Sequence, residues 1–163
     1  NVQVLKYLSE HFVIEPQGLR LVLLSDYTKA FYSGMLPGSI SRLYTPDQIQ
    51  IDLKSLCEWC GAEFICDKLL SIDWDTKQLI CENDKYQFDY TCINIGSETK
   101  SSEQEGVLEH AITTRPISEL LVKIEQKESQ LQQTKTAEDK QRKVIVVGSG
   151  AAGLELAWAF KYV

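Results

Sequence analysis

Residues 144–155 restrict the fold of this chain more than any other segment, because an apolar run leads through a glycine-rich turn into an apolar helix. The run is Val144-Ile145-Val146-Val147, the turn is Gly148-Ser149-Gly150-Ala151-Ala152-Gly153, and the helix follows from Leu154. A strand, G-x-G-x-x-G and a helix in this order form the context that a dinucleotide fingerprint requires. The segment therefore predicts an α/β fold with a phosphate site at the start of the helix.

Each glycine of this turn has its own expected role. Gly148 makes the tight turn out of the strand, Gly150 lets a pyrophosphate approach the backbone, and Gly153 lets the helix pack against the sheet. A tight turn without function is the alternative. Glu155, on the apolar helix, either stabilises the helix N-terminus electrostatically or is a buried acid facing the ligand, and the sequence leaves both open. The acid expected on the ribose, about 20 residues further on, would fall after Val163.

Composition limits the classes of function. The 163 residues suit one ordinary domain, and a net charge of −6 argues against binding to duplex nucleic acid. No apolar run approaches the roughly 20 residues of a membrane helix. Five cysteines are too few for a disulfide scaffold and favour a reducing, intracellular compartment, cytoplasmic by default or else mitochondrial. Neither of the two histidines lies near a nucleophile motif, so a catalytic triad has no support.

Cys57-Glu58-Trp59-Cys60 has the C-x-x-C spacing of redox dithiols, but it lies near the C-terminal end of a predicted helix. There the helix dipole opposes a thiolate, and the remaining cysteines supply no second pair for zinc. Structural cysteines are the favoured interpretation, and a cysteine-based redox or metal protein is the alternative.

Apolar periodicity predicts the remaining elements. Helices are expected from the first residues to Phe12, from Thr45 to Cys60 with Gly61 as its end, and from Pro116 to Leu131. A strand buried on both faces is expected over 19–24, a β-meander over 62–95 and a strand over 90–95. Residues 134–143 resemble a solvated linker. Because the chain begins inside a helix, we expect an N-terminal truncation.

Three of these segments together resemble the FAD-dependent pyridine nucleotide-disulfide oxidoreductases, in their type II NADH dehydrogenase-like branch. Tyr32-Ser33-Gly34-Met35-Leu36-Pro37-Gly38 is similar to a motif of the subgroup associated with selenide, water dikinase. The segment Phe88–Ser97 resembles the strand that closes the FAD half, and Gly148–Glu155 resembles the second glycine motif, which opens the NAD(P)H domain. The expected fold is α/β and Rossmann-like, with a parallel sheet and a β-meander, and incomplete at both ends.

The resemblance also implies an organisation and site residues. Residues 1–142 would be a partial FAD-binding domain without its first strand and glycine loop, and residues 143–163 would be the first βα unit of an NAD(P)H-binding domain. Ser25, with Asp26 beside it, stands where the family has the acid on the FAD ribose, which is a departure from the family's pattern. Lys68 and Leu69 border the adenine, and Gly96 and Ser97 match the turn near the flavin phosphates. Glu155 matches an acid near the contact of flavin and nicotinamide. The segment Lys29-Ala30-Phe31 departs from the subgroup's pattern.

These implications give a first hypothesis, a flavoprotein oxidoreductase that passes hydride from NAD(P)H to FAD and on to a quinone or another small acceptor. No catalytic side chain is expected, because the cofactor carries the chemistry. A non-catalytic nucleotide-binding or interaction module that retains the fold is the alternative. We expect the 163-residue piece alone to be inactive, marginally stable and a weak binder of FAD. The sequence leaves the acceptor, the choice of NADH or NADPH, and the oligomeric state open.

Overall fold

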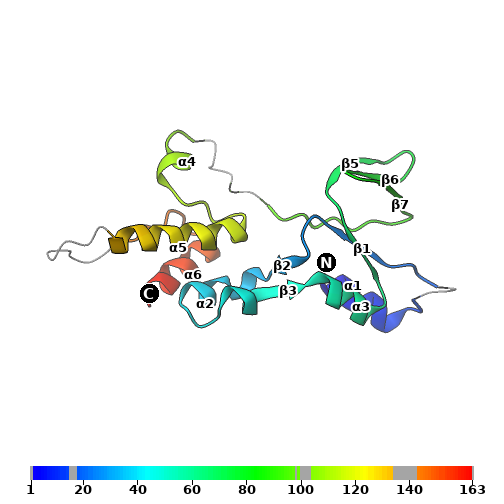
Figure 1. Cartoon of the computed structure of the whole chain (residues 1–163), viewed down its shortest axis with the longest axis horizontal. Helices are drawn as coiled ribbons and strands as arrows, with labels where there is room; N and C mark the ends of the chain where they lie inside the picture. The colour runs from blue at the N-terminus through cyan, green and yellow to red at the C-terminus, as the bar shows by residue number, and fades with distance from the viewer. Residues whose placement is uncertain (1, 15–17, 98, 100–103, 134–142, 163) are drawn as a thin grey trace. The chain divides into compact units, whose positions relative to one another are not determined.

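The computed structural model describes residues 2–14, 18–97, 99, 104–133 and 143–162 (Figure 1). The chain divides into two compact units, one formed by residues 1–30 and 51–95 and the other by residues 31–50 and 96–163. Each unit combines segments that lie far apart in the sequence. The division into domains at residues 142 and 143 stays a prediction.

The first unit contains a parallel strand pair with a helix between the two strands in sequence. β1 (Val22–Ser25) pairs with β4 (Glu63–Cys66), in a register that runs from Val22 opposite Glu63 to Ser25 opposite Cys66. Helices α1 (Val2–His11) and α3 (Leu53–Cys60) belong to the same unit. The predicted opening helix is thus present. β1 is shorter than predicted and only half-buried, because among the described strands β4 alone pairs with it.

The meander of the first unit is present largely as predicted. β5 (Leu69–Asp73), β6 (Gln78–Cys81) and β7 (Lys85–Gln87) form an antiparallel sheet in that order. Asp73 shapes the first turn, because its Oδ1 accepts the backbone N–H groups of Asp75 and Thr76 at 3.0 and 3.1 Å. The run Phe64-Ile65-Cys66, which we assigned to the meander, instead belongs to β4 and its parallel pair.

The single helix predicted over residues 45–60 is wrong in its first half. The structure has a 3-10 turn, η2 (Pro46–Ile49), then β3 (Gln50–Asp52), which pairs with β2 (Lys29–Phe31), and only then α3. Ile49 is buried in the core of the second unit, whereas Leu53 belongs to the first. One continuous helix would have placed both side chains on the same face.

Two predicted strands are absent, and nearly all of their residues are exposed. The segments 90–95 and 144–147 have no regular structure. Tyr90 is 95% exposed and Val147 is 94% exposed. A strand is stable only when a neighbour satisfies its backbone hydrogen bonds, and no strand of the described chain pairs with either segment. The strand predictions over 90–95 and 144–147 are therefore wrong for this structure, because apolar composition does not show what would pair with a segment.

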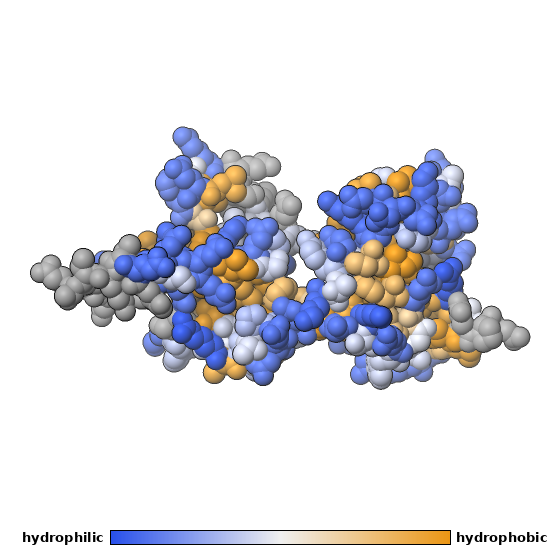
Figure 2. Space-filling model, viewed as in Figure 1, coloured by the Kyte–Doolittle hydropathy of each residue, from blue (hydrophilic) through white to orange (hydrophobic). Residues whose placement is uncertain are grey.

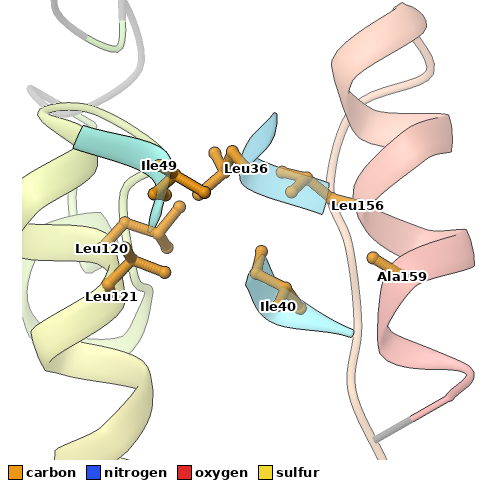
Figure 3. Packing of buried hydrophobic residues seen from close by; sticks show 7 residues of the cluster. All are labelled: Leu36, Ile40, Ile49, Leu120, Leu121, Leu156 and Ala159. Carbon is orange, nitrogen blue, oxygen red and sulfur yellow. The ribbon is translucent and has the colours of Figure 1, made fainter. Parts of the chain in front are cut away.

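The second unit is helical and encloses the main hydrophobic core. Its elements are η1 (Ser33–Met35), α2 (Leu36–Ile40), η2, α4 (Val107–His110), α5 (Ile117–Gln133) and α6 (Ala151–Phe160). In Figure 3 side chains from α2, η2, α5 and α6 point toward one another: Leu36, Ile40, Ile49, Leu120, Leu121, Leu156 and Ala159. The helix predicted after Pro116 is therefore present, and its apolar face lies in this core. Hydrophobic residues also reach the surface, as Figure 2 shows.

Both ends of α3 are fixed by the residues that flank it. The Oδ1 atom of Asp52 accepts the backbone N–H of Ser55 at 2.8 Å, and Gly61 ends the helix with a φ of 69°, as predicted. The hydrogen bonds from Ser55, together with the charge of Lys29, hold the pKa of the Asp52 carboxyl below its usual range and outweigh the effect of burial.

We expect Asp52→Asn to reduce the acid sensitivity of the fold while leaving its stability at pH 7 nearly unchanged. Asn caps helices about as well as Asp but does not titrate. Because the folded-state pKa of Asp52 is lowered, its contribution is complete above the unfolded-state pKa and is lost as the pH falls through the folded-state pKa. Urea unfolding of both proteins between about pH 7 and pH 2 measures this. If the free energy of unfolding fell equally with pH in both proteins, this prediction would be wrong.

Candidate functional site

The glycine turn leads directly into α6. Gly148 has a φ of +119°, a value that side-chain-bearing residues rarely adopt. Gly150 is the N-cap residue of α6, with ordinary extended dihedrals of −70° and 169°. The first helical hydrogen bond joins the N–H of Leu154 to the carbonyl of Gly150 at 3.1 Å. The turn therefore changes direction at Gly148 and begins the helix at Gly150.

Two of the three glycines of the turn are required by the backbone, each for a different reason. A Cβ atom at Gly153 would collide with the carbonyl oxygen of Gly148, so this position must be glycine for the turn to close. Gly148 is required by its positive φ. Neither reason applies to Gly150, because its dihedrals suit any residue and a Cβ there would meet nothing within 4 Å. Its missing side chain leaves open space in front of the backbone.

The start of α6 can hold an anion. No side chain caps Gly150, and the first-turn N–H groups of a helix lack partners within the helix. Ser149, Ala151 and Ala152 are exposed beside it. Glu155 is exposed as well, so the buried-acid alternative does not describe it here. The open space, the free N–H groups and the helix dipole together fit a diphosphate.

A second set of predicted residues lies at the carboxyl edge of the parallel pair in the first unit. The N–H of Asp67 donates to the carbonyl of Ser25 at 3.1 Å, which joins the end of β4 to the end of β1. Lys68 and Leu69 follow Asp67, and Asp26 follows Ser25 with an exposed side chain. In open α/β sheets ligands bind outside the carboxyl ends of the strands. The structure thus brings together the residues predicted for the adenine and the ribose.

Asp67 is a residue of this edge that the sequence analysis missed. Its side chain is only 4% exposed. Its Oδ1 accepts the N–H of Lys68 at 2.8 Å and the Nδ2–H of Asn83 at 2.9 Å. Burial alone would raise the pKa of this carboxyl, but the hydrogen bonds from Lys68 and Asn83 outweigh it and lower the pKa. Its position directly after an apolar strand was the available signal.

The remaining predicted residues lie in the second unit. Gly96 has a φ of +79°, and a Cβ there would meet nothing within 4 Å. Ser97 follows it, exposed, in an irregular segment. The segment 32–38 forms η1 and the start of α2, anchored by the Tyr32 N–H on the carbonyl of Ile49 at 2.8 Å. The structure therefore groups Gly96, Ser97, this segment and the glycine turn in one unit, and the β1 and β4 edge in the other.

The cysteine pair of α3 is buried. Cys57 is 1% exposed and Cys60 is 4% exposed, and burial, with a smaller effect of Cys60, raises the pKa of the Cys57 thiol. A raised pKa disfavours the reactive thiolate. Across the described residues no three side chains of His, Cys, Asp or Glu are placed to hold a metal ion. This environment favours a structural role for the pair.

Labelling with DTNB at about pH 8 should therefore modify only the two exposed thiols of the folded protein, Cys66 and Cys92. All five cysteines should react after unfolding in urea. Peptide mapping identifies the modified residues. In the Cys66→Ser variant, Cys92 should be the one thiol that reacts rapidly with DTNB. Rapid labelling of Cys57 or Cys60 in the folded chain would indicate a reactive dithiol instead.

A family model described as pyridine nucleotide-disulphide oxidoreductase matches residues 11–163. The chain belongs to this family. The fold of this pyridine nucleotide-disulphide oxidoreductase chain is similar to the crystal structure of sulfide:quinone oxidoreductase from the hyperthermophilic bacterium Aquifex aeolicus, with a TM-score of 0.51 and 21% sequence identity. The similarity covers 69% of this chain and 27% of that one, so this chain spans about a quarter of its length. No curated protein matches the chain.

The predicted fold class is confirmed. This family member has an α/β, Rossmann-like fold for FAD and NAD(P) binding, with a parallel strand pair and a β-meander. Members of the family bind FAD and a pyridine nucleotide. In the part of the chain that is described, no helix is both long and apolar enough to cross a bilayer.

Proposed function

We propose that this chain is part of a flavoprotein oxidoreductase of the type II NADH dehydrogenase-like branch, which passes hydride from NAD(P)H to FAD and on to a quinone or another small acceptor. The family assignment supports the general activity. The geometry of the glycine turn supports a dinucleotide as one ligand.

Gly150 is the observation that carries this proposal. A residue with ordinary dihedrals and open space around its Cβ position has no structural need to be glycine. In a dinucleotide site the need is explained, because a side chain there would hold the pyrophosphate away from the backbone N–H groups. The alternative of a turn without function explains Gly148 and Gly153 but leaves Gly150 without a reason.

Each group of residues has a separate task in this proposal. The turn over 148–153 holds the pyrophosphate of NAD(P)H on backbone N–H groups at the start of α6. Ser25, Asp26, Lys68 and Leu69 border the ribose and adenine of FAD, and Gly96 and Ser97 lie near its phosphates. When bound, FAD would supply the two-electron redox chemistry between the nicotinamide and the acceptor. The residues of this chain bind and orient the cofactors.

A quinone is the acceptor class that we favour. One solved structure with a similar fold is a sulfide:quinone oxidoreductase, so a quinone-reducing enzyme can be built on this Rossmann-like fold. A small acceptor also agrees with the net charge of −6, which disfavours nucleic acid as a partner.

The test uses the complete protein that contains this chain, purified in the presence of FAD. We expect a yellow protein whose flavin absorbance bleaches when NADH is added without oxygen and recovers when a soluble quinone follows. Binding of dinucleotide with no bleaching by NADH or NADPH would favour the non-catalytic module. A colourless protein that takes up no FAD would refute the proposal.

A further inference from the structure

Asp67 is a buried acid whose hydrogen-bonding capacity is used within the chain itself. Lys68 and the side chain of Asn83 donate to its carboxylate, as described above. The backbone N–H of Asn83 also donates to the carboxylate at 3.3 Å, and the hydroxyl of Tyr86 donates to Oδ2 at 3.5 Å. Carboxylates are rarely this buried unless they are paired or fully hydrogen-bonded. Because N–H and O–H groups of the chain surround both oxygens, Asp67 is unsuited to contact a ligand directly.

The same residue joins three segments at the edge proposed for the nucleotide. Through its own N–H it binds the end of β1 at Ser25, and through its carboxylate it binds the turn between β6 and β7 at Asn83. The N–H of Glu82, in that turn, donates to the carbonyl of Lys68 at 2.9 Å. The backbone of Lys68 is therefore held on both sides, by Asp67 and by the turn.

We propose that Asp67 is a positioning residue for the adenosine half of the FAD site, an inference that rests on the proposed function. It sets the positions of Ser25, Lys68 and Leu69 at the carboxyl edge of β1 and β4, so that this edge is formed before the ligand arrives. Preformed sites avoid the entropic cost of ordering their backbone on binding. Asp67 thus acts through its neighbours rather than by touching the ligand.

Other ionisable groups face Asp67 in this network. Cys81, Asp84 and Tyr86 surround it, and burial together with the charges of Asp67 and Asp84 raises the pKa values of the Cys81 thiol and the Tyr86 hydroxyl. The Cys81 thiol and the Tyr86 hydroxyl therefore stay protonated near pH 7. The network should keep its hydrogen bonds throughout the neutral range.

Asp73 offers a matched control in the same meander. Its carboxylate also accepts two backbone N–H groups, and its pKa is likewise lowered, mainly by the side chain and backbone of Thr76. It lies in the turn between β5 and β6, at the other end of β5 from Lys68 and Leu69. Loss of Asp73 should therefore disturb the meander without disturbing the proposed edge.

The experiment is an NMR titration of the complete protein that contains this chain, freed of its flavin, with AMP, which detects weak binding, and with FMN as a ligand without adenine. In the unsubstituted chain, AMP should shift the amides of Ser25, Asp26, Lys68 and Leu69, and FMN should not. Asp67→Ala should weaken AMP binding by roughly tenfold or more, because AMP must then order the backbone of Ser25 and Lys68 as it binds. Asp67→Asn retains the Oδ1 contacts and should recover most of the affinity, and Asp73→Ala should bind AMP normally.

Each outcome decides something. If a folded Asp67→Ala variant binds AMP like the unsubstituted protein, the inference is wrong but the proposed FAD site stands. The same holds if Asp73→Ala loses as much AMP affinity as Asp67→Ala. If Asp67→Ala does not fold, Asn83→Ala removes the partner amide instead, and unchanged AMP affinity in that variant overturns the inference. Absence of AMP-induced shifts at the edge in the unsubstituted chain refutes the proposed FAD site, and the inference with it.

Discussion

Gly150→Val should weaken dinucleotide binding at the start of α6 by roughly a hundredfold, while the poorer N-cap lowers the stability of the fold by only about 1 kcal/mol. The backbone at Gly150 has dihedrals that valine adopts readily, and its Cβ position is open. Valine would instead occupy the space in front of the first-turn N–H groups. Losing one or two hydrogen bonds to a charged phosphate costs about 3 kcal/mol, or roughly a hundredfold in affinity.

The measurement is a titration with NADH followed by the amide NMR signals of residues 148–153, paired with urea unfolding of the same protein. Ala157→Val is the matched control, because it adds the same side chain at an exposed position of the same helix. We expect this control to bind NADH normally. If Gly150→Val retains full affinity, the open space is not a phosphate site and the proposed function loses its main support.

Gly153→Ala should behave differently from Gly150→Val, and the contrast separates structure from binding. A Cβ at Gly153 meets the backbone carbonyl of Gly148, which cannot move without opening the turn. This variant should lose stability and NADH binding together. The sequence motif already gives Gly150 and Gly153 separate roles, and the structure predicts a distinct phenotype for each substitution. Equal stability of Gly153→Ala and the unsubstituted chain in urea would contradict this.

The elements that the sequence predicted well are those with local causes. Gly61 ends α3 and Asp73 forms its turn through interactions between residues close in sequence. Such signals are visible without knowing the tertiary structure. The opening helix, the meander and α6 were predictable for the same reason.

The wrong predictions concern interactions between distant residues. The segments 90–95 and 144–147 have strand composition, but a strand also needs a partner, and composition does not name one. Ile49 and Leu53 have helical spacing, yet they are buried in different units. Periodicity identifies residues that will be buried without identifying what they pack against.

The candidate site shows the same limit. Its glycine turn was predictable because the apolar run, the glycine motif and the helix follow one another directly in the sequence. The Asp67 network was not, because Asn83 and Tyr86 lie 16 and 19 residues away and their meeting depends on how the meander folds back. A buried carboxylate of this kind becomes apparent only when its donors are in place around it.

Leu156→Ala should be among the most destabilising single substitutions in the second unit. Leu156 is 5% exposed and packs in the cluster that joins α6 to α2, η2 and α5 (Figure 3). Removing a buried leucine side chain costs about 2 to 5 kcal/mol, from lost burial and from the cavity that remains. Leu154 lies two residues earlier on the same helix and is 65% exposed.

Leu154→Ala is therefore the control, with an expected change within about 0.5 kcal/mol. Urea unfolding followed by circular dichroism in the helix region measures both variants, and amide hydrogen exchange in α6 shows whether the loss is local. Because Leu36 and Ile40 share the cluster with Leu156, the substitution should also loosen α2, and faster exchange there should accompany the loss of stability. If both variants unfold at the same urea concentration, α6 is not held by this core and its packing against α2 is incorrect.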